Sequence, residues 1–210
     1  MIDYKTITVT PFAQNCRIFV NYDTSECVVV DPGDRAEDIY NAIVEAKLTL
    51  KAILITHIHL DHVGAVAKLS KLSGAKIMGS SIEDEPIKTS LPMQAVNFGL
   101  NECEKFETEY LKDGDIIEPM SDFSLKVLHT PGHTPGGVCY YCKKLKLVLT
   151  GDTLFNGSVG RTDFPMGDYD SLIKGIKTKL FALDDETEVL SGHGPNSTIL
   201  DEKTTNPYVV

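Results

Sequence analysis

Four metal-binding side chains lie within six residues of this 210-residue chain: His57, His59, Asp61 and His62. Imidazole nitrogens and carboxylate oxygens suit zinc, iron and manganese. His57 and His59 are two residues apart, so in extended backbone they point the same way and can chelate one ion. Asp61 and His62 can face a second ion where the chain turns into a helix. Burying such groups without a partner would cost several kcal/mol, so a metal site is the favoured interpretation.

Secondary structure is expected on both sides of this cluster. The apolar run 52–55 predicts a buried strand, and residues 64–69 are predicted to begin a helix. The cluster therefore lies at the carboxyl end of a strand, where open α/β sheets tend to place their chemistry.

Three further residues of the same ligand types follow predicted strands: His133, Asp152 and His193. Each is next to a glycine, which permits the close backbone approach that a tight metal cage requires. Five of the six histidines thus lie in loops at strand ends, and the sixth, His129, lies just inside a strand. We expect these loops to meet at one edge of the fold.

The pattern of apolar runs and turn residues predicts a single domain, residues 1–210, with two similar halves of about 1–110 and 111–210. The first three strands are expected to form an antiparallel meander. Two sheets facing one another with helices outside would make a four-layer αβ/βα sandwich of the α/β class. The predicted strands are 7–10, 16–20, 27–30, 52–55, 75–78, 116–117, 123–128, 138–141, 145–149 and 188–190, and the predicted helices are 35–47, 64–72 and 169–180.

Residues 82–110 break the periodic pattern. Prolines and a glycine interrupt it, and acidic residues such as Asp84 add negative charge. We expect irregular helical pieces at the surface, which form either a solvated cover or a lid or wall beside the metal loops.

Composition and charge narrow the classes of function. Apolar residues make up 42% and charged residues 24%, which argues against disorder. The net charge of −10 argues against nucleic acid or an anionic membrane as a partner, because both are polyanions. The first residues lack the features of a signal peptide, and the sequence has no apolar run of about 20 residues, so we expect a soluble, cytoplasmic protein.

Five cysteines do not indicate a disulfide framework in a chain of this length. Cys139 and Cys142 form a CxxC pattern, but residues three apart on a strand face opposite sides. We therefore expect free thiols rather than a redox or zinc pair.

The Thr-His-x-His-x-Asp-His block and the later Pro-Gly-His-Thr-Pro-Gly, Gly-Asp-Thr-Leu-Phe and Gly-His-Gly-Pro motifs resemble those of the metallo-β-lactamase superfamily over essentially the whole chain. Within it, the chain looks most like short bacterial members of the glyoxalase II (hydroxyacylglutathione hydrolase) group, and it also resembles the persulfide dioxygenases. The resemblance implies the αβ/βα sandwich and two divalent metal ions. It assigns ligand roles by position: His57, His59 and His133 to the first metal, Asp61, His62 and His193 to the second, and Asp152 to both.

Further positions acquire expected roles from the same resemblance. Asp31, at the end of its strand, would orient a ligand through a hydrogen bond, whereas His129 is not a ligand in this pattern. Arg161 matches a cationic position that can meet a glutathione carboxylate, although Asp163 stands where the long glyoxalase II enzymes have a tyrosine. Only residues 194–210 follow the last histidine loop, too few for the helical region that helps the long enzymes bind glutathione.

The expected mechanism follows from such a site. Two cations about 3.5–4 Å apart would hold a water and lower its pKa toward neutrality. The metal-bound hydroxide would attack a carbonyl carbon, with Asp61 and Asp152 as the candidate catalytic carboxylates. A departing thiolate, with a conjugate-acid pKa of about 8.5, needs little protonation. The site alone does not exclude other esters or amides. The resemblance to glyoxalase II implies hydrolysis of a small-molecule glutathione thioester such as S-lactoylglutathione, with zinc as the favoured metal and iron or manganese as alternatives.

The strongest alternative is a mononuclear iron dioxygenase that acts on glutathione persulfide. His59, His133 and Asp152 would then give ferrous iron two imidazoles and a carboxylate and leave positions open for dioxygen. The intact Asp61 and His62 favour the hydrolase. We expect neither an exported β-lactamase, for want of a signal peptide, nor a nuclease, because of the acidic charge. An electron carrier would need a flavodoxin domain, and a non-catalytic binding protein would be expected to have lost ligands.

Overall fold

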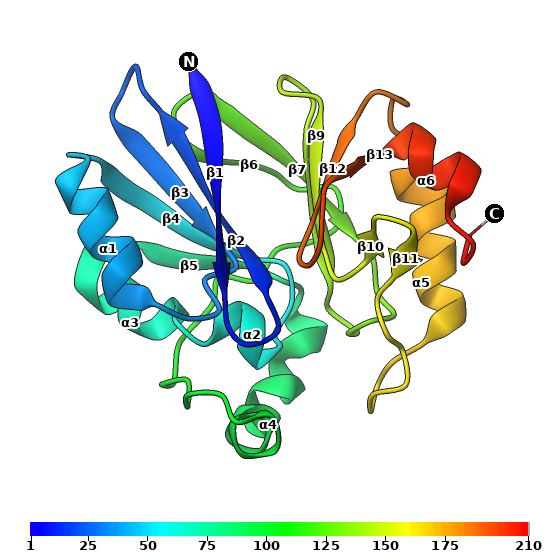
Figure 1. Ribbon diagram of the computed structural model, residues 1–210, viewed down its shortest axis with the longest axis horizontal. Coiled ribbons are helices and arrows are strands. Elements are labelled where there is room, and N and C mark those ends of the chain that lie inside the picture. Colours follow the sequence, from blue (N-terminus) through cyan, green and yellow to red (C-terminus); the bar gives the residue numbers. More distant parts are fainter. Residues whose placement is uncertain (210) are drawn as a thin grey trace.

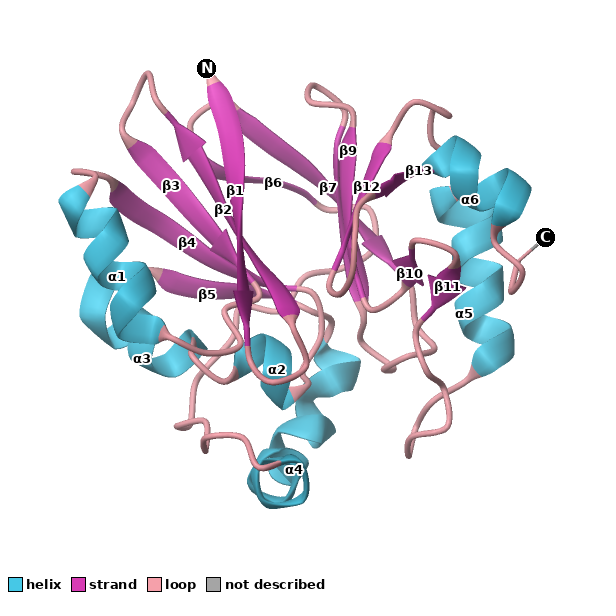
Figure 2. Cartoon of the chain, in the orientation of Figure 1, coloured by secondary structure: helices cyan, strands magenta, loops and turns pink. Residues whose placement is uncertain are grey.

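Two β-sheets face one another, and helices cover their outer sides (Figures 1 and 2). The structure is a computed structural model that describes residues 1–209. Its layers are helices, sheet, sheet and helices. The predicted αβ/βα sandwich is therefore confirmed.

The first half of the chain forms a five-stranded sheet. Its elements are β1 (Ile2–Val9), β2 (Gln14–Asn21), β3 (Glu26–Val30), α1 (Ala36–Glu45), β4 (Thr49–Ile55), α2 (Leu60–Val63), α3 (Val66–Ser73) and β5 (Lys76–Gly79). The first three strands form the predicted antiparallel meander. β4 and β5 then join in parallel, because a helix crossover returns the chain to the same edge each time.

The second half forms a six-stranded sheet in the order β13-β12-β9-β8-β7-β6. β6 to β9 are antiparallel, and β12 joins β9 in parallel after a long helical connection. The elements are β6 (Ile116–Met120), β7 (Phe123–His129), β8 (Val138–Cys142), β9 (Leu147–Gly151), β10 (Leu154–Phe155), β11 (Ser158–Val159), α5 (Tyr169–Gly175), a π-helical turn (Ile176–Leu180), β12 (Glu188–Ser191), β13 (Ser197–Thr198) and α6 (Ile199–Thr205).

One apolar cluster lies between the sheets, and two others lie beneath the helices of the first and second halves. Phe19 and Phe123 join the two sheets, with stacked rings whose centroids are 4.8 Å apart. Cys139 packs in the outer cluster under α5, whereas Cys142 packs between the sheets. The prediction that they face opposite sides is confirmed, and all five cysteines are free thiols.

A cover segment lies at the edge of the fold where the strand-end loops meet (Figure 1). It consists of a 3-10 helix, η1 (Ile82–Ser90), and a helix, α4 (Leu91–Phe98). These are the irregular helical pieces predicted for this region. The expectation of a solvated acidic surface is wrong for Asp84, which is 0% exposed. Its carboxylate is buried because four hydrogen-bond donors surround it.

Several short elements were not predicted. The two-residue strands β10, β11 and β13 are too short to give an alternating pattern. α6 has only seven residues, but Thr198 caps it by accepting a hydrogen bond from the Asp201 backbone. The helix predicted over 169–180 is present, capped by Asp168, with its last turn in π-helical form.

Within residues 1–209, no helix is both long and apolar enough to cross a membrane.

Candidate metal centre

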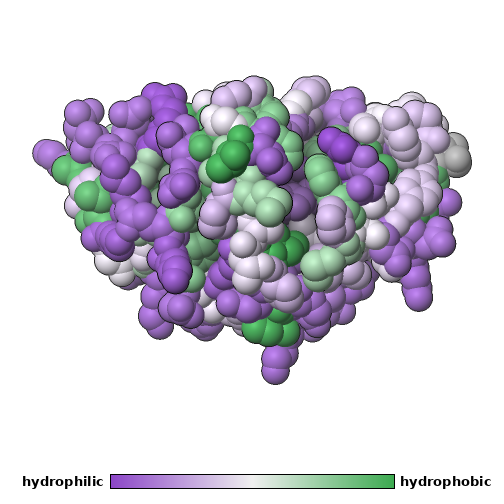
Figure 3. Space-filling view, turned by 90° about the horizontal axis from the view of Figure 1, so that it is seen from below, coloured by the Kyte–Doolittle hydropathy of each residue, from purple (hydrophilic) through white to green (hydrophobic). Residues whose placement is uncertain are grey.

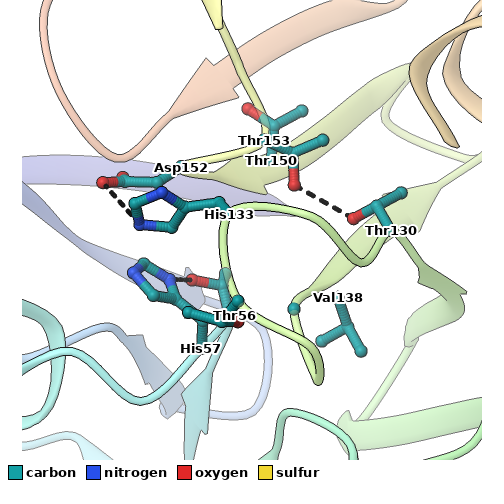
Figure 4. Close-up of a pocket in the computed structure, with 10 residues that line it drawn as sticks. Thr56, His57, Thr130, His133, Val138, Thr150, Asp152 and Thr153 are labelled. Carbon is teal, nitrogen blue, oxygen red and sulfur yellow. Dashed lines mark hydrogen bonds and ion pairs between the residues drawn. The ribbon is translucent and has the colours of Figure 1, made fainter. Parts of the chain in front are cut away.

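The loops after β4, β7, β9 and β12 converge between the two sheets and carry the predicted ligands. Figure 4 shows His57 and His133 facing one another, with Asp152 beside His133. Three groups of ligand atoms each lie within 4.8 Å of one another: His57, His59 and His133; His57, His62 and Asp152; and Asp61, His62 and His193. The fold thus brings all seven predicted ligands into one cluster.

Asp152 lies at the middle of the cluster. Its Oδ2 is 3.6 Å from His133 Nε2 and 3.5 Å from His193 Nε2, and its Oδ1 is 3.2 Å from His62 Nε2. This crowding needs a glycine at position 192, since a Cβ on Gly192 would lie 2.4 Å from Asp152 Oδ1 and 2.7 Å from His62 Cε1. We call His57, His59 and His133 the first group and Asp61, His62 and His193 the second group. Asp152 lies where its carboxylate can serve both of them.

Asp31 orients two of the histidines. Its Oδ2 accepts hydrogen bonds from His62 Nδ1 at 3.0 Å and from the Thr56 hydroxyl at 2.7 Å, and its Oδ1 accepts from the Thr56 backbone at 2.7 Å. Because the Thr56 hydroxyl donates to Asp31, it accepts from His57 Nδ1, 3.0 Å away. Both imidazoles therefore carry a proton on Nδ1 and turn Nε2 toward the centre, as metal-binding histidines do.

Backbone carbonyls orient two more histidines. His133 Nδ1 donates to the Arg161 carbonyl at 2.7 Å, and His193 Nδ1 donates to the Phe12 carbonyl at 3.0 Å. Since a carbonyl can only accept, Nδ1 of each ring carries a proton, and Nε2 is the atom that faces the centre. His59 differs, because its Nδ1 is the atom that faces the cluster, 3.0 Å from His133 Nε2.

The residues fit divalent cations. His57 Nε2 is buried and has no hydrogen-bond partner, although an unsatisfied buried polar group costs about 1–3 kcal/mol. Asp152 Oδ1 is also buried and makes no well-aligned hydrogen bond, and its nearest charged neighbour is His62 Nε2, 3.2 Å away. Both atoms face the centre and belong to the ligand groups described above. Imidazole nitrogens and carboxylate oxygens in groups of three are the usual donors for zinc and for other first-row metals. A cation bound at the centre would satisfy both atoms.

Two imidazoles of the first group, His57 and His59, are neutral. Burial lowers the pKa of His57 well below its ordinary value, and the neighbouring His62 adds to this effect. Burial and the nearby His133 lower the pKa of His59 to about 3. Both rings are therefore in the form that binds a metal.

The second group holds opposite charges. Burial by itself would raise the pKa of Asp152, but the charge of His62 and a hydrogen bond with His193 hold it well below its ordinary value. The same two residues outweigh burial and lower the pKa of Asp61. Against the effect of burial, Asp152 and Asp61 raise the pKa of His62 well above its ordinary value and that of His193 to about 9. The two ionised carboxylates are thus stabilised by the positive charge of His62 and His193. A divalent cation can supply this charge in place of the protons on the two imidazoles.

Arg161 lies at the rim of the cluster rather than within it. Its exposed guanidinium makes a bidentate ion pair with Asp163, with N–O distances of 2.9 and 2.8 Å, and lies 4.4 Å from the centroid of the Phe164 ring. Phe164 in turn contacts the ring of His59, with centroids 5.5 Å apart. His129, as expected, lies outside the cluster, where its Nε2 donates to the Pro135 carbonyl.

Several contributors were not found from the sequence. Phe12 supplies a carbonyl to His193, and its ring meets that of Phe98 edge-on, with centroids 5.7 Å apart. Both rings are partly exposed, and Figure 3, which views the side of α2 and α4, shows apolar patches within a mostly hydrophilic face. Asp84 and Gln94 of the cover segment accept hydrogen bonds from backbone N–H groups of the loop after β4, which carries His57 and His59. A turn residue, an acidic run and a lone glutamine give no sequence signal of such contacts.

Sequence comparison extends the description of this site. The family model described as "Metallo-beta-lactamase superfamily" matches residues 9–193, a range that contains all seven clustered residues. "Hydroxyacylglutathione hydrolase GloC" of Haemophilus influenzae is 41% identical over 210 residues, which cover 99% of this chain and 98% of that protein.

Solved structures show the same similarity. BLEG-1 B3 metallo-beta-lactamase matches with a TM-score of 0.91 and 33% identity, covering 99% of this chain and 100% of that one. TTHA1623, solved in a di-iron-bound form, matches with a TM-score of 0.86 and 35% identity, covering 97% and 99% of the two chains. The similarity therefore extends over nearly the full length in both sequence and fold.

Proposed function

The chain belongs to the metallo-beta-lactamase superfamily, and from this premise we propose that it is a metal-dependent hydrolase that cleaves a glutathione thioester such as S-lactoylglutathione. The observation that carries the proposal is the pair of ligand groups that share access to Asp152. The 41% identity to a hydroxyacylglutathione hydrolase supports the thioester as substrate. The proposal includes zinc as the metal, a cytoplasmic location, a single domain and a small-molecule partner rather than nucleic acid or membrane.

Two ligand sets would hold the metals. His57, His59 and His133 would bind one cation, and Asp61, His62 and His193 the other, with Asp152 between them. Two bound divalent cations would supply Lewis acidity and lower the pKa of water toward neutrality.

The chain's own residues prepare the reaction in three ways. Asp31 and the carbonyls of Arg161 and Phe12 fix the histidine rings, so that little reorganisation is needed on binding. Asp61 and Asp152, kept ionised by their neighbours, would hold the cations that acidify the attacking water, whose proton would pass to solvent. Water adds to the thioester carbonyl, the C–S bond breaks, and the thiolate leaves with little need of a proton, because its conjugate-acid pKa is about 8.5.

Arg161 is the proposed substrate contact. Its guanidinium lies over Phe164, which touches a ring of the first group, so it is close enough to meet the polar end of a substrate bound at the centre. Without substrate, the guanidinium is paired with the carboxylate of Asp163. A carboxylate of glutathione would take the place of Asp163 in this ion pair.

The test is metal content per chain on freshly purified protein, measured together with turnover of S-D-lactoylglutathione without oxygen. We expect two metals per chain and thioester loss that does not depend on oxygen. A chromogenic cephalosporin is the matched control for general hydrolysis and should turn over far more slowly. One iron per chain, no thioester turnover and oxygen consumption with glutathione persulfide would overturn the proposal in favour of the dioxygenase.

A further inference from the structure

The backbone N–H groups of Ile58 and Leu60, the residues before and after His59, are held by side chains of the cover segment. The Ile58 N–H donates to Asp84 Oδ2 at 3.2 Å, and the Leu60 N–H donates to Gln94 Oε1 at 2.8 Å. Both acceptors come from elements more than twenty residues further along the chain. The backbone that carries His59 is therefore fixed from outside its own loop.

Asp84 also fixes the loop that carries His133. The Gly136 N–H donates to Asp84 Oδ1 at 2.6 Å, and the Thr134 hydroxyl donates to Asp84 Oδ2 at 3.1 Å. One buried carboxylate thus joins two loops whose histidines face each other, with His59 Nδ1 3.0 Å from His133 Nε2.

The packing around Asp84 is specific for a carboxylate. A Cβ on Gly136 would lie 2.7 Å from Asp84 Cγ and 2.6 Å from Asp84 N, so the loop can approach only as glycine. Each carboxylate oxygen accepts from at least one backbone N–H, which can never act as an acceptor. Burial raises the pKa of Asp84, and the donated hydrogen bonds oppose this effect.

The second ligand group is supported differently. His62 is held by Asp31 from the end of β3, and His193 by the Phe12 carbonyl in the turn between β1 and β2. A defect at Asp84 or Gln94 should therefore act on one group of ligands and spare the other.

We propose that Asp84 and Gln94 are positioning residues that align His59 and His133 for the first metal. The inference rests on the proposed metal centre but assigns roles that the resemblance did not supply. An isosteric Asp84→Asn change leaves only one acceptor oxygen for donors on both sides, so one N–H would face an amide N–H. Loss of a partner that orients metal ligands typically costs about 10–100-fold in metal affinity.

The experiment is stepwise metal titration of metal-free Asp84→Asn protein, compared with wild type. We expect one of the two binding steps to weaken by about 10–100-fold and the other to stay unchanged. The matched control is Glu202→Gln, another buried carboxylate that accepts hydrogen bonds from Gly157 and Asn206, away from the centre. It should lower thermal stability without altering either step. Wild-type affinities at both steps in Asp84→Asn would overturn the inference.

Gln94 gives a second route should Asp84→Asn fail to fold. Gln94→Met removes the acceptor for the Leu60 N–H, and Gln94→Glu restores one. We expect Met to weaken the same metal step and Glu to recover it; equal behaviour of the two variants would overturn the role of Gln94.

Hydrogen exchange separates this inference from the proposed function. In metal-free Asp84→Asn the Ile58 amide should exchange faster than in wild type, and in metal-free Gln94→Met the Leu60 amide should do so. Faster exchange in a protein whose wild type binds no metal would sink the proposed function and keep the positioning contacts. If the wild type bound two metals and the two variants exchanged these amides at the wild-type rate, the positioning contacts would be overturned and the proposed function would stand.

Discussion

The two groups of predicted metal ligands differ in charge and in what supports them. The first group, His57, His59 and His133, contains only imidazoles, and burial holds the pKa of His59 at about 3. The second group adds the carboxylate of Asp61, whose pKa is lowered by His62. The first therefore offers only nitrogen donors, whereas the second attracts a cation by the charge of a carboxylate as well.

Their supports come from different parts of the chain. The first group depends on the cover segment through Asp84 and Gln94, and Asp31 reaches it only through Thr56. The second group depends on Asp31 directly and on the turn between β1 and β2. Ligands that are neighbours in one sequence motif are thus held by elements that lie far apart in the sequence. This teaches that a short motif can specify donors while distant residues specify their geometry.

Removing metal should have the largest effect. We expect a chelator to abolish thioester hydrolysis, because no other group near the centre can supply equivalent Lewis acidity within residues 1–209. Partial removal should empty the first group first, since Asp61 adds negative charge to the second. Activity and metal content followed together, with zinc added back, measure this. Full turnover by protein shown to be metal-free would contradict it.

Asp152→Ala should affect both groups at once. The carboxylate contacts His62 and His193 of the second group and His133 of the first. We expect kcat/KM to fall by at least about 100-fold, the loss typical of removing one electrostatic contributor to the transition state. Asp185→Ala is the control, because that carboxylate pairs with Lys203 at the surface. Full activity in Asp152→Ala would rule out a shared role.

Asp31→Asn should weaken metal binding at the second group more than at the first. Asp31 accepts from His62 directly and reaches His57 only through Thr56. We expect affinity at the second group to fall by about 10–100-fold, with a smaller effect on the first. Stepwise metal titration measures both. If Asp31→Asn and Asp84→Asn weakened the same binding step, the two groups would not have separate supports.

The sequence was sufficient to predict the sandwich and the cluster because both depend on local patterns. Strands buried on both faces give continuous apolar runs such as 52–55, and ligand residues stand directly after them. The αβ/βα arrangement and the convergence of the strand-end loops are confirmed. That these residues bind metal stays a prediction.

Asp31 was expected to orient a ligand, but the supports from the cover segment could not be predicted, because their roles depend on tertiary contacts. Asp84 stands between Glu83 and Glu85, and such a run reads as a solvated acidic surface. Its burial follows from donors at Ile58 and Gly136, which come near only after the sheets have packed. The hydrogen bond of Gln94 has the same origin.

Arg161→Ala should have the smallest effect and should separate substrate binding from metal binding. The Arg161 carbonyl holds His133, and this contact survives loss of the side chain, so metal content should not change. The guanidinium is exposed, so we expect KM for the glutathione thioester to rise by about 2–5-fold, the range of an exposed charge pair, with kcat unchanged.

Two further variants decide whether the Arg161 charge itself is used. Arg161→Lys keeps a cation and should recover part of the KM, while Asp163→Asn releases the guanidinium from its ion pair and should lower KM. Steady-state kinetics on S-D-lactoylglutathione measure all three variants. An identical KM throughout would make the Arg161–Asp163 pair a surface contact without a part in substrate binding, and the substrate would then be held by the metal centre and its aromatic rim alone.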